Sequence, residues 1–188
     1  MTNELIEILD MCSVDNSIGV RLDECMIADL NTDMLGRLYK DLQRIEEASL
    51  LLVGVSPFRV KSKRSILSKV EKYKDTDYSL QHVFKDILAC RNIVEKYPVP
   101  VDNEHIRNYV RDYEVGYRAV HYIYTKSPYH YPIEVQYWLK KDELFNALSH
   151  KYLYKPKRNK ELCIKMRNIY DTGLIKTEED FVRCLKSM

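Results

Sequence analysis

Two strand-like segments, Tyr117–Thr125 and Tyr131–Leu139, lie in the second half of a chain whose two ends both show helical periodicity. Ser127-Pro128 separates the two segments, and this dipeptide is a turn signal. Two β-compatible segments joined by so short a turn predict an antiparallel hairpin. Any fold for this chain must therefore pack helices around a sheet that contains the hairpin.

Helices are predicted at both ends of the chain. Apolar residues recur at helical spacing from Leu35 to Val53, after capping side chains at Asn31–Asp33, and a weaker helical pattern precedes them in the first thirty residues. The helical period returns at Asp142 and continues through 162–169 and 178–185. Both ends of the chain should therefore be helical.

Strands and helices are predicted to alternate between these ends. Phe58–Lys61 alternates apolar and basic residues and should form a short strand that leads into a helix opened by Ser65. Ser79–Phe84 predicts a short helix, Ile87–Val94 a buried strand, and 105–110 another short helix. We expect an α+β fold with a small mixed β-sheet flanked by helices.

Length and charge limit the organisation of the chain. With 188 residues, of which 45% are hydrophobic, it can bury one core but is short for two. We expect one domain over 1–188, with a helical N-terminal part (1–54), a central part (55–155) and C-terminal helices (156–188). The 30 Lys and Arg residues nearly balance 28 Asp and Glu residues, so any polyanion site must arise from local clustering.

Five cysteines, an odd number, lack the spacing of a metal site. They predict reduced thiols and a cytoplasmic protein. No apolar run approaches the roughly 20 residues of a membrane span, and the N-terminus resembles no secretory signal. We expect a soluble protein with no membrane partner.

A basic run crosses the predicted strand–helix junction at 59–69. Alternation along the strand places Arg59 and Lys61 on one face of the sheet, and helical spacing aligns Ser65 with Lys69. Free N–H groups at a helix start and fixed cations both favour anions, so the junction suits a triphosphate. A solvated basic face is the alternative interpretation.

Two carboxylates lie on predicted strands. Asp86 directly precedes the strand at 87–94, and Glu134 shares a face with Gln136 between apolar neighbours. Two carboxylates on a sheet can hold Mg²⁺, the metal that phosphoryl-type transfer needs. Each could equally be a salt-bridge partner.

The segment Gly116–His121 places Tyr117 and His121 on one strand face. Tyr117 could stack on a base, a role in which Phe should replace it, while His121 reaches phosphate or ribose. The alternative is a surface tyrosine and a histidine with an ordinary structural hydrogen bond. Farther along, His150 and Tyr154 are four residues apart on a predicted helix.

In combination and order, these segments resemble the synthetase domain of the RelA/SpoT family, in particular its short stand-alone alarmone synthetases. The resemblance covers 55–155. The residues that carry it are Arg59, Lys61, Ser65-Ile66 and Lys69; Asp86 and Arg91; Gly116-Tyr117-Arg118-Ala119-Val120-His121; Glu134 and Gln136; and His150 and Tyr154-Lys155.

This resemblance implies a nucleotidyltransferase-like fold, with 55–155 as its catalytic core. It also implies a pyrophosphokinase that moves the β,γ-diphosphate of ATP to the ribose 3′-hydroxyl of GDP or GTP. By the same resemblance, Arg59, Lys61, Ser65 and Lys69 bind ATP, and Asp86 and Glu134 hold the cofactor Mg²⁺. The resemblance also implies that Glu134 is the general base and that Asp86 and Gln136 assist catalysis. The residues that it implies for acceptor binding are Tyr117, Arg118, His121 and His150.

Departures from the family pattern leave the acceptor open. The chain is shorter than usual between Asp86 and Gly116, and Trp138-Leu139 replaces the usual Arg-Thr. The stretch before Gly116 also lacks the family's Lys-Pro-Asn cluster, and no His-Asp pair supports a hydrolase.

One alternative is the toxin branch of the family, which pyrophosphorylates the 3′ end of tRNA or makes adenine alarmones. A basic cluster could seat an acceptor stem: Lys151, Lys155, Lys157, Arg158, Lys160, Lys165 and Arg167. A second alternative is an inactive nucleotide-binding module. A homo-oligomer and a neutralising antitoxin remain open as partners.

Overall fold

The computed structural model describes residues 1–99, 104–112, 116–154, 156 and 159–188. The chain divides into two compact units. The first unit comprises Met1–Asn92, Pro98–Asn108 and His121–Gln136, and the second comprises Ile93–Tyr97, Tyr109–Val120 and Tyr137–Met188. The single domain expected from the sequence stays a prediction.

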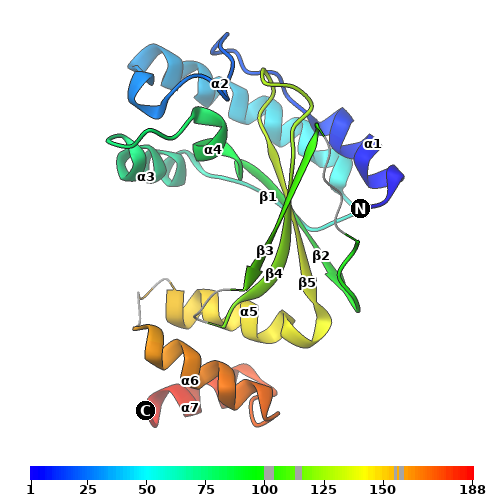
Figure 1. Ribbon diagram of the computed structural model, residues 1–188, viewed down its shortest axis with the longest axis vertical. Coiled ribbons are helices and arrows are strands. Elements are labelled where there is room, and N and C mark those ends of the chain that lie inside the picture. Colours follow the sequence, from blue (N-terminus) through cyan, green and yellow to red (C-terminus); the bar gives the residue numbers. More distant parts are fainter. Residues whose placement is uncertain (100–103, 113–115, 155, 157–158) are drawn as a thin grey trace. The chain divides into compact units, whose positions relative to one another are not determined.

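The N-terminal part of the first unit is helical, as predicted. Asn31 caps the longest helix by accepting the Met34 N–H at 3.0 Å. Leu38 and Leu42 of this helix are buried, and it lies beside the first helix (Figure 1). The helices of this part are α1 (Asn3–Cys12), η1 (Ile27–Asp29), α2 (Thr32–Ser49) and η2 (Leu50–Leu52).

Five strands form one sheet in the order β1-β2-β5-β4-β3. β1 pairs antiparallel with β2, so that Val60 lies opposite Leu88. β4 and β5 are neighbours joined by a connection too short for a parallel crossover, which confirms the predicted hairpin. The strands are β1 (Phe58–Val60), β2 (Leu88–Val94), β3 (Ile106–Asp112), β4 (Arg118–Tyr124) and β5 (Ile133–Leu139).

The sheet is mixed. The neighbouring strands β2 and β5 both begin in the first unit and end in the second. They therefore run in the same direction. The adjacent β1–β2 pair is antiparallel. The α+β class with a small mixed sheet flanked by helices is therefore confirmed.

The short helix predicted at 105–110 is wrong, because this segment belongs to β3. A helix of one or two turns is marginal, since nucleation costs more than its few hydrogen bonds return. Pairing with β4 supplies those hydrogen bonds from a neighbour instead. Isolated periodicity in so short a segment could not anticipate that pairing.

Two helices connect β1 to β2, namely α3 (Lys63–Tyr73) and α4 (Leu80–Phe84). Ser62 caps α3 and Ser79 caps α4, each through its side-chain oxygen. The first helix therefore begins before Ser65, which lies within its first turn. The strand–helix junction expected at 58–69 is confirmed.

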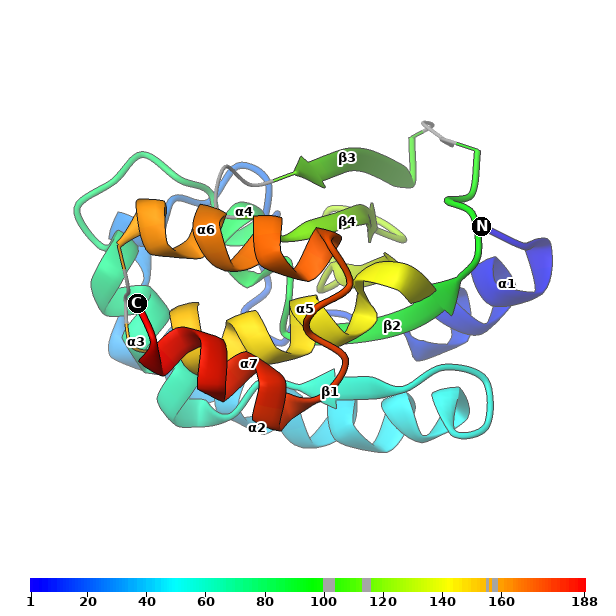
Figure 2. The same ribbon diagram turned by 90° about the horizontal axis from the view of Figure 1, so that it is seen from below.

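Helices of the second unit pack around a buried apolar cluster. Figure 2 shows α5, α6 and α7 close together, and α6 contacts both others. The cluster contains Phe145, Leu148, Leu153, Cys163, Met166, Ile175 and Phe181. The elements are η3 (Lys140–Asp142), α5 (Glu143–Ser149), η4 (His150–Tyr154), α6 (Lys160–Asp171) and α7 (Glu178–Lys186).

One helical prediction in this unit needs correction. His150 and Tyr154 were expected on a continuing α-helix, but α5 ends at Ser149 and they lie on the π-helical turn η4. A π turn changes the angular spacing of side chains from that of an α-helix. The two side chains therefore lack the alignment that α-helical periodicity predicts.

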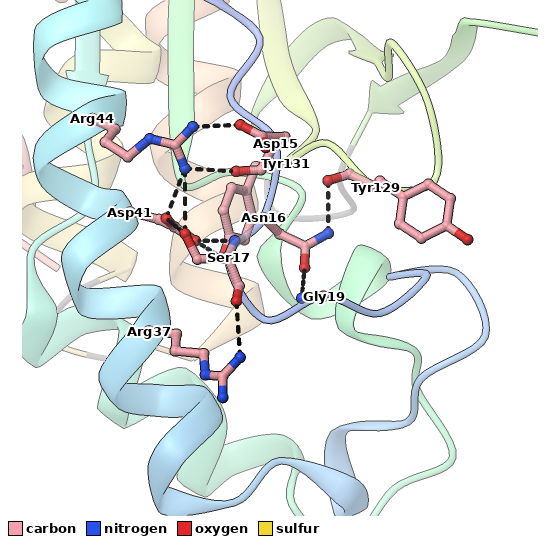
Figure 3. A network of polar contacts seen from close by, with 9 residues as sticks. All are labelled: Asp15, Asn16, Ser17, Gly19, Arg37, Asp41, Arg44, Tyr129 and Tyr131. Carbon is pink, nitrogen blue, oxygen red and sulfur yellow. Dashed lines mark hydrogen bonds and ion pairs between the residues drawn. The ribbon is translucent and has the colours of Figure 1, made fainter.

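A polar network in the first unit ties an N-terminal loop to α2 and to the residues before β5 (Figure 3). The fully buried carboxylate of Asp41 accepts hydrogen bonds from the Tyr131 hydroxyl at 2.9 Å and the Ser17 N–H at 2.8 Å. Arg44 pairs with Asp41 at 3.0 Å and also with Asp15. The network restrains the chain just before β5, the strand that carries Glu134.

Among the residues that the structure describes, no helix is both long and apolar enough to cross a membrane. All five cysteines are free thiols. Burial raises the pKa of the Cys90 thiol to about 12, which keeps it protonated at neutral pH.

Candidate active site

Asp86 lies between two lysines in the first unit. Lys61 Nζ is 2.9 Å from Asp86 Oδ2, and Lys69 Nζ is 2.6 Å from Asp86 Oδ1. The pairing of β1 with β2 explains this arrangement, because it brings the end of β1 beside the residues that precede β2. The Lys61 N–H donates to the Ile87 carbonyl at 2.7 Å in the same place.

These three side chains are mostly shielded from water, with 15% of Lys61, 19% of Lys69 and 18% of Asp86 exposed. Burial by itself would raise the pKa of Asp86, but the charges and hydrogen bonds of Lys69 and Lys61 hold it below its usual value. Two ammonium groups against one carboxylate leave the cluster with a net positive charge. Such a cluster attracts anions.

Arg59 and Ser65 lie on the same two elements, β1 and α3. The Arg59 side chain is exposed, while Lys61 follows the end of β1. The Ser65 hydroxyl lies 3.0 Å from Ser62 Oγ, in the first turn of α3. The structure therefore places Arg59 on β1, Lys61 directly after it, and Ser65 and Lys69 on α3. Their role in binding ATP stays a prediction.

Glu134 is buried, with 3% of its surface exposed, and both of its carboxylate oxygens have partners. His121 Nδ1 lies 2.7 Å from Oε1, and Gln136 Nε2 donates to Oε2 at 2.7 Å. This contact confirms that Glu134 and Gln136 share one face of β5. His121, on the neighbouring strand β4, is itself 1% exposed and contacts the carboxylate. This contact agrees with the alternative in which His121 makes a structural hydrogen bond.

A row of polar side chains therefore crosses three adjacent strands. Arg91 Nε on β2 donates to Gln136 Oε1 at 3.4 Å, and the row continues to Glu134 and His121. Because Arg91 donates to the oxygen of the Gln136 amide, the NH₂ group of that amide is directed to Glu134. The order β2-β5-β4 in the sheet is what brings these distant segments together.

The donor chemistry of Asp86 and Glu134 fits Mg²⁺, which prefers carboxylate oxygens and keeps water or phosphate oxygens in its other positions. In the described part of the chain, no three or more His, Cys, Asp or Glu side chains gather as a metal site. An ion bound to these two carboxylates would draw its other oxygen ligands from water or from the phosphates of a substrate. The assignment of both carboxylates to the metal stays a prediction.

Tyr117 belongs to the second unit and packs edge-to-face against the rings of Trp138 and Tyr154. Trp138 Nε1 donates to the Tyr117 hydroxyl at 2.9 Å. The Tyr154 ring lies 6.5 Å from the Tyr117 ring at an interplanar angle of 86°. Of the other predicted acceptor residues, Arg118 lies 3.6 Å from Asp171, and His150 is exposed on η4.

Arg167 has a structural role that the sequence did not predict. It is only 4% exposed, donates to the Gly116 carbonyl at 3.2 Å, and pairs with the buried Asp142 and with Asp171. The spacing of Arg167 and Asp171 on α6 was the one available signal, because residues four apart on a helix are neighbours.

The basic cluster proposed for an acceptor stem is accordingly smaller than expected. Arg167 does not belong to it, because its guanidinium is buried and paired. Lys151 pairs with Glu178 at 2.6 Å and Lys165 with Glu161 at 3.0 Å. These two ion pairs neutralise part of the positive charge that remains in the cluster. The cluster members that lie outside the described residues are Lys155, Lys157 and Arg158.

Gly116→Ala is expected to lower the free energy of unfolding by about 3 kcal/mol, because a left-handed alanine is strained and the buried ion pair of Arg167 must shift. Gly116 has φ +87°, and an added Cβ would lie 2.6 Å from Arg167 Cβ. Urea unfolding measures the loss. Gly173→Ala is the matched control, since Gly173 has φ +78° and nothing within 4 Å of an added Cβ. Equal losses in the two variants would show that the close approach to Arg167 is unimportant.

No family model matches the chain, and neither does any curated protein sequence. Among solved structures, the chain is similar to small alarmone synthetase 1 from Bacillus subtilis bound to its product pppGpp, at 17% identity and a TM-score of 0.48, over 83% of this chain and 95% of that one. A second structure of that enzyme has 21% identity and a TM-score of 0.46, over 83% and 94%. Small alarmone synthetase 2 from the same organism has 20% identity and a TM-score of 0.42, over 82% and 95%. Small alarmone synthetases, which the motifs resemble, are thus among the solved structures similar to this chain.

Proposed function

We propose that this chain is an ATP-dependent pyrophosphokinase that transfers the β,γ-diphosphate of ATP to the ribose 3′-hydroxyl of GDP or GTP and so makes (p)ppGpp-type alarmones. The observation that carries the proposal is the buried Glu134, held through both oxygens in the same unit as the positive cluster around Asp86. A fixed carboxylate suits proton removal, and a positive cluster suits a polyphosphate.

The donor nucleotide would bind along β1 and α3. Arg59 and Ser65 offer an exposed guanidinium and a hydroxyl, and Lys61 and Lys69 offer ammonium groups that turn from Asp86 to the phosphates. Asp86 and Glu134 would then hold Mg²⁺, which when bound neutralises charge on the phosphate oxygens.

Glu134 would accept the proton of the acceptor hydroxyl. The 3′-oxygen forms a bond to the β-phosphorus of ATP, the bond between that phosphorus and the bridging α,β-oxygen breaks, and AMP leaves. With Glu134 ionised, His121 Nδ1 and Gln136 Nε2 both donate to it and hold its orientation. Tyr117 would stack on the acceptor base, with Arg118 and His150 as further acceptor contacts.

Incubation with ATP labelled in its β- and γ-phosphates, together with GDP, GTP, ATP or tRNA as acceptor, tests the proposal. Label on GDP or GTP, dependent on Mg²⁺, is the expected result. Label on tRNA or on an adenine nucleotide would instead assign the chain to toxin-type synthesis. No label on any acceptor would leave an inactive nucleotide-binding module.

Arg59→Ala is expected to raise the KM for ATP about tenfold to a hundredfold, the equivalent of a charge-assisted hydrogen bond worth about 1.5 to 3 kcal/mol. The KM for the acceptor should not change. Steady-state kinetics with each substrate varied in turn measure both constants. Arg64→Ala is the control, because Arg64 is an exposed cation of the same run outside the motif. A change confined to the acceptor would show that this strand binds the other substrate.

A further inference from the structure

Three consecutive residues around Tyr117 are each held by a side chain from a different element of the second unit. These side chains are all buried, with at most 4% of each exposed. Arg167 of α6 donates to the Gly116 carbonyl at 3.2 Å, Trp138 of β5 donates to the Tyr117 hydroxyl at 2.9 Å, and Asn146 of α5 bonds the Arg118 N–H at 3.3 Å and carbonyl at 2.8 Å.

The contact between Trp138 and Tyr117 is the specific part of this arrangement. An indole N–H can only donate, and a buried donor without an acceptor is costly, so the Tyr117 oxygen is the partner that satisfies it. The two ring centroids lie 6.0 Å apart at an interplanar angle of 84°. The phenol oxygen is thus fixed at one end of the tyrosine side chain.

The other end of that side chain is fixed by the backbone. The hydrogen bonds to Gly116 and Arg118 hold the chain on either side of Tyr117. Fixing the backbone and the hydroxyl oxygen fixes the direction of the side chain, but that oxygen lies on the axis about which the ring turns, so the plane of the ring is set by packing. The edge-to-face contacts with the Trp138 ring, 6.0 Å away, and the Tyr154 ring, 6.5 Å away, restrict this rotation. Stacking depends on that plane, and a preset plane lowers the entropy lost on binding.

We infer that Trp138 is a positioning residue for the acceptor nucleotide: its indole N–H fixes the direction of the Tyr117 side chain, and its ring restrains the plane on which the acceptor base stacks. The inference rests on the proposed function for the identity of the ligand. It reverses the expectation that Phe can replace Tyr117, because Phe would leave the buried indole N–H without this acceptor.

Intrinsic fluorescence tests the inference without catalysis, because Trp138 is the only tryptophan of the chain. Titration of the full chain with GDP should change its emission in a saturable manner, and a non-hydrolysable α,β-methylene analogue of ATP should change it much less. Tyr117→Ala should abolish the response to GDP. No response to GDP in the wild type, or an equal response in Tyr117→Ala, would overturn the inference.

Kinetics provide the second test. Trp138→Phe and Tyr117→Phe remove the same hydrogen bond from its two sides, so each should lower kcat/KM for the acceptor about fivefold to tenfold and leave the KM for ATP unchanged. The double variant should lose no more than either single one, because one interaction is removed in all three. Losses that multiply, or that fall equally on ATP, would contradict the assignment.

Tyr124→Phe is the matched control, since the Tyr124 hydroxyl donates a comparable 3.0 Å hydrogen bond to Asp10 in the first unit. It should leave kcat/KM for the acceptor unchanged. Tyr117→Phe is the smaller perturbation and decides the matter if Trp138→Phe does not fold. If the wild type transfers label and Trp138→Phe and Tyr117→Phe keep its kcat/KM for the acceptor, the positioning role alone is refuted. If GDP changes the fluorescence but no label is transferred, the proposed function alone is refuted.

Discussion

Glu134→Gln is expected to lower transfer by about a hundredfold to ten-thousandfold, the usual contribution of a general base. The amide has nearly the same volume as the carboxylate but cannot accept the proton of the 3′-hydroxyl. His121 and Gln136 are the two hydrogen-bond partners of Glu134. The NH₂ group of the new glutamine would face one of these donors, and the lost hydrogen bond costs about 1 kcal/mol of stability. The fold should therefore persist while activity is lost.

Label transfer at saturating Mg²⁺, ATP and GDP measures this loss, and thermal unfolding checks that the protein is folded. Glu143→Gln is the control, because Glu143 is an exposed carboxylate at the start of α5 with the same chemistry. Turnover close to that of the wild type in Glu134→Gln would remove Glu134 from the reaction.

Asp86→Asn is expected to lower transfer on the order of a thousandfold, because in the proposed role Asp86 binds Mg²⁺, and such a ligand supports several kcal/mol of charge stabilisation. Its effect on binding should have the opposite sign. Without Mg²⁺, ATP must displace Asp86 from Lys61 and Lys69, whereas in Asp86→Asn neither ammonium has to leave a carboxylate. Metal-free binding of ATP should therefore become about tenfold tighter.

Calorimetric titration with a non-hydrolysable ATP analogue, in EDTA and in Mg²⁺, separates the two effects. The variant should bind the analogue more tightly in EDTA and gain less from Mg²⁺ than the wild type does. Asp77→Asn serves as the control, because Asp77 is an exposed carboxylate before α4. Weaker binding by Asp86→Asn in EDTA would show that Lys61 and Lys69 do not exchange Asp86 for phosphate.

Local pattern was sufficient to predict several features of this protein. Capping by Asn31 and the hairpin of β4 and β5 depend on residues close in sequence. The contact between Glu134 and Gln136 follows from the period of two along a strand, which places alternate side chains on one face wherever the strand lies. For these elements the sequence by itself therefore determined the element type and which side chains share a face of the strand.

Contacts between distant segments were decided only by the tertiary structure. The pairing of β1 with β2 turned Lys61 and Asp86 from separate candidates into an ion pair, and pairing with β4 made a strand of 106–112. Packing of α6 buries Arg167, although its basic neighbours in the sequence had suggested that it belongs to an exposed basic cluster. Periodicity reports which face of an element is apolar, but not which element covers that face, so the partners of a charged group depend on how the whole chain packs.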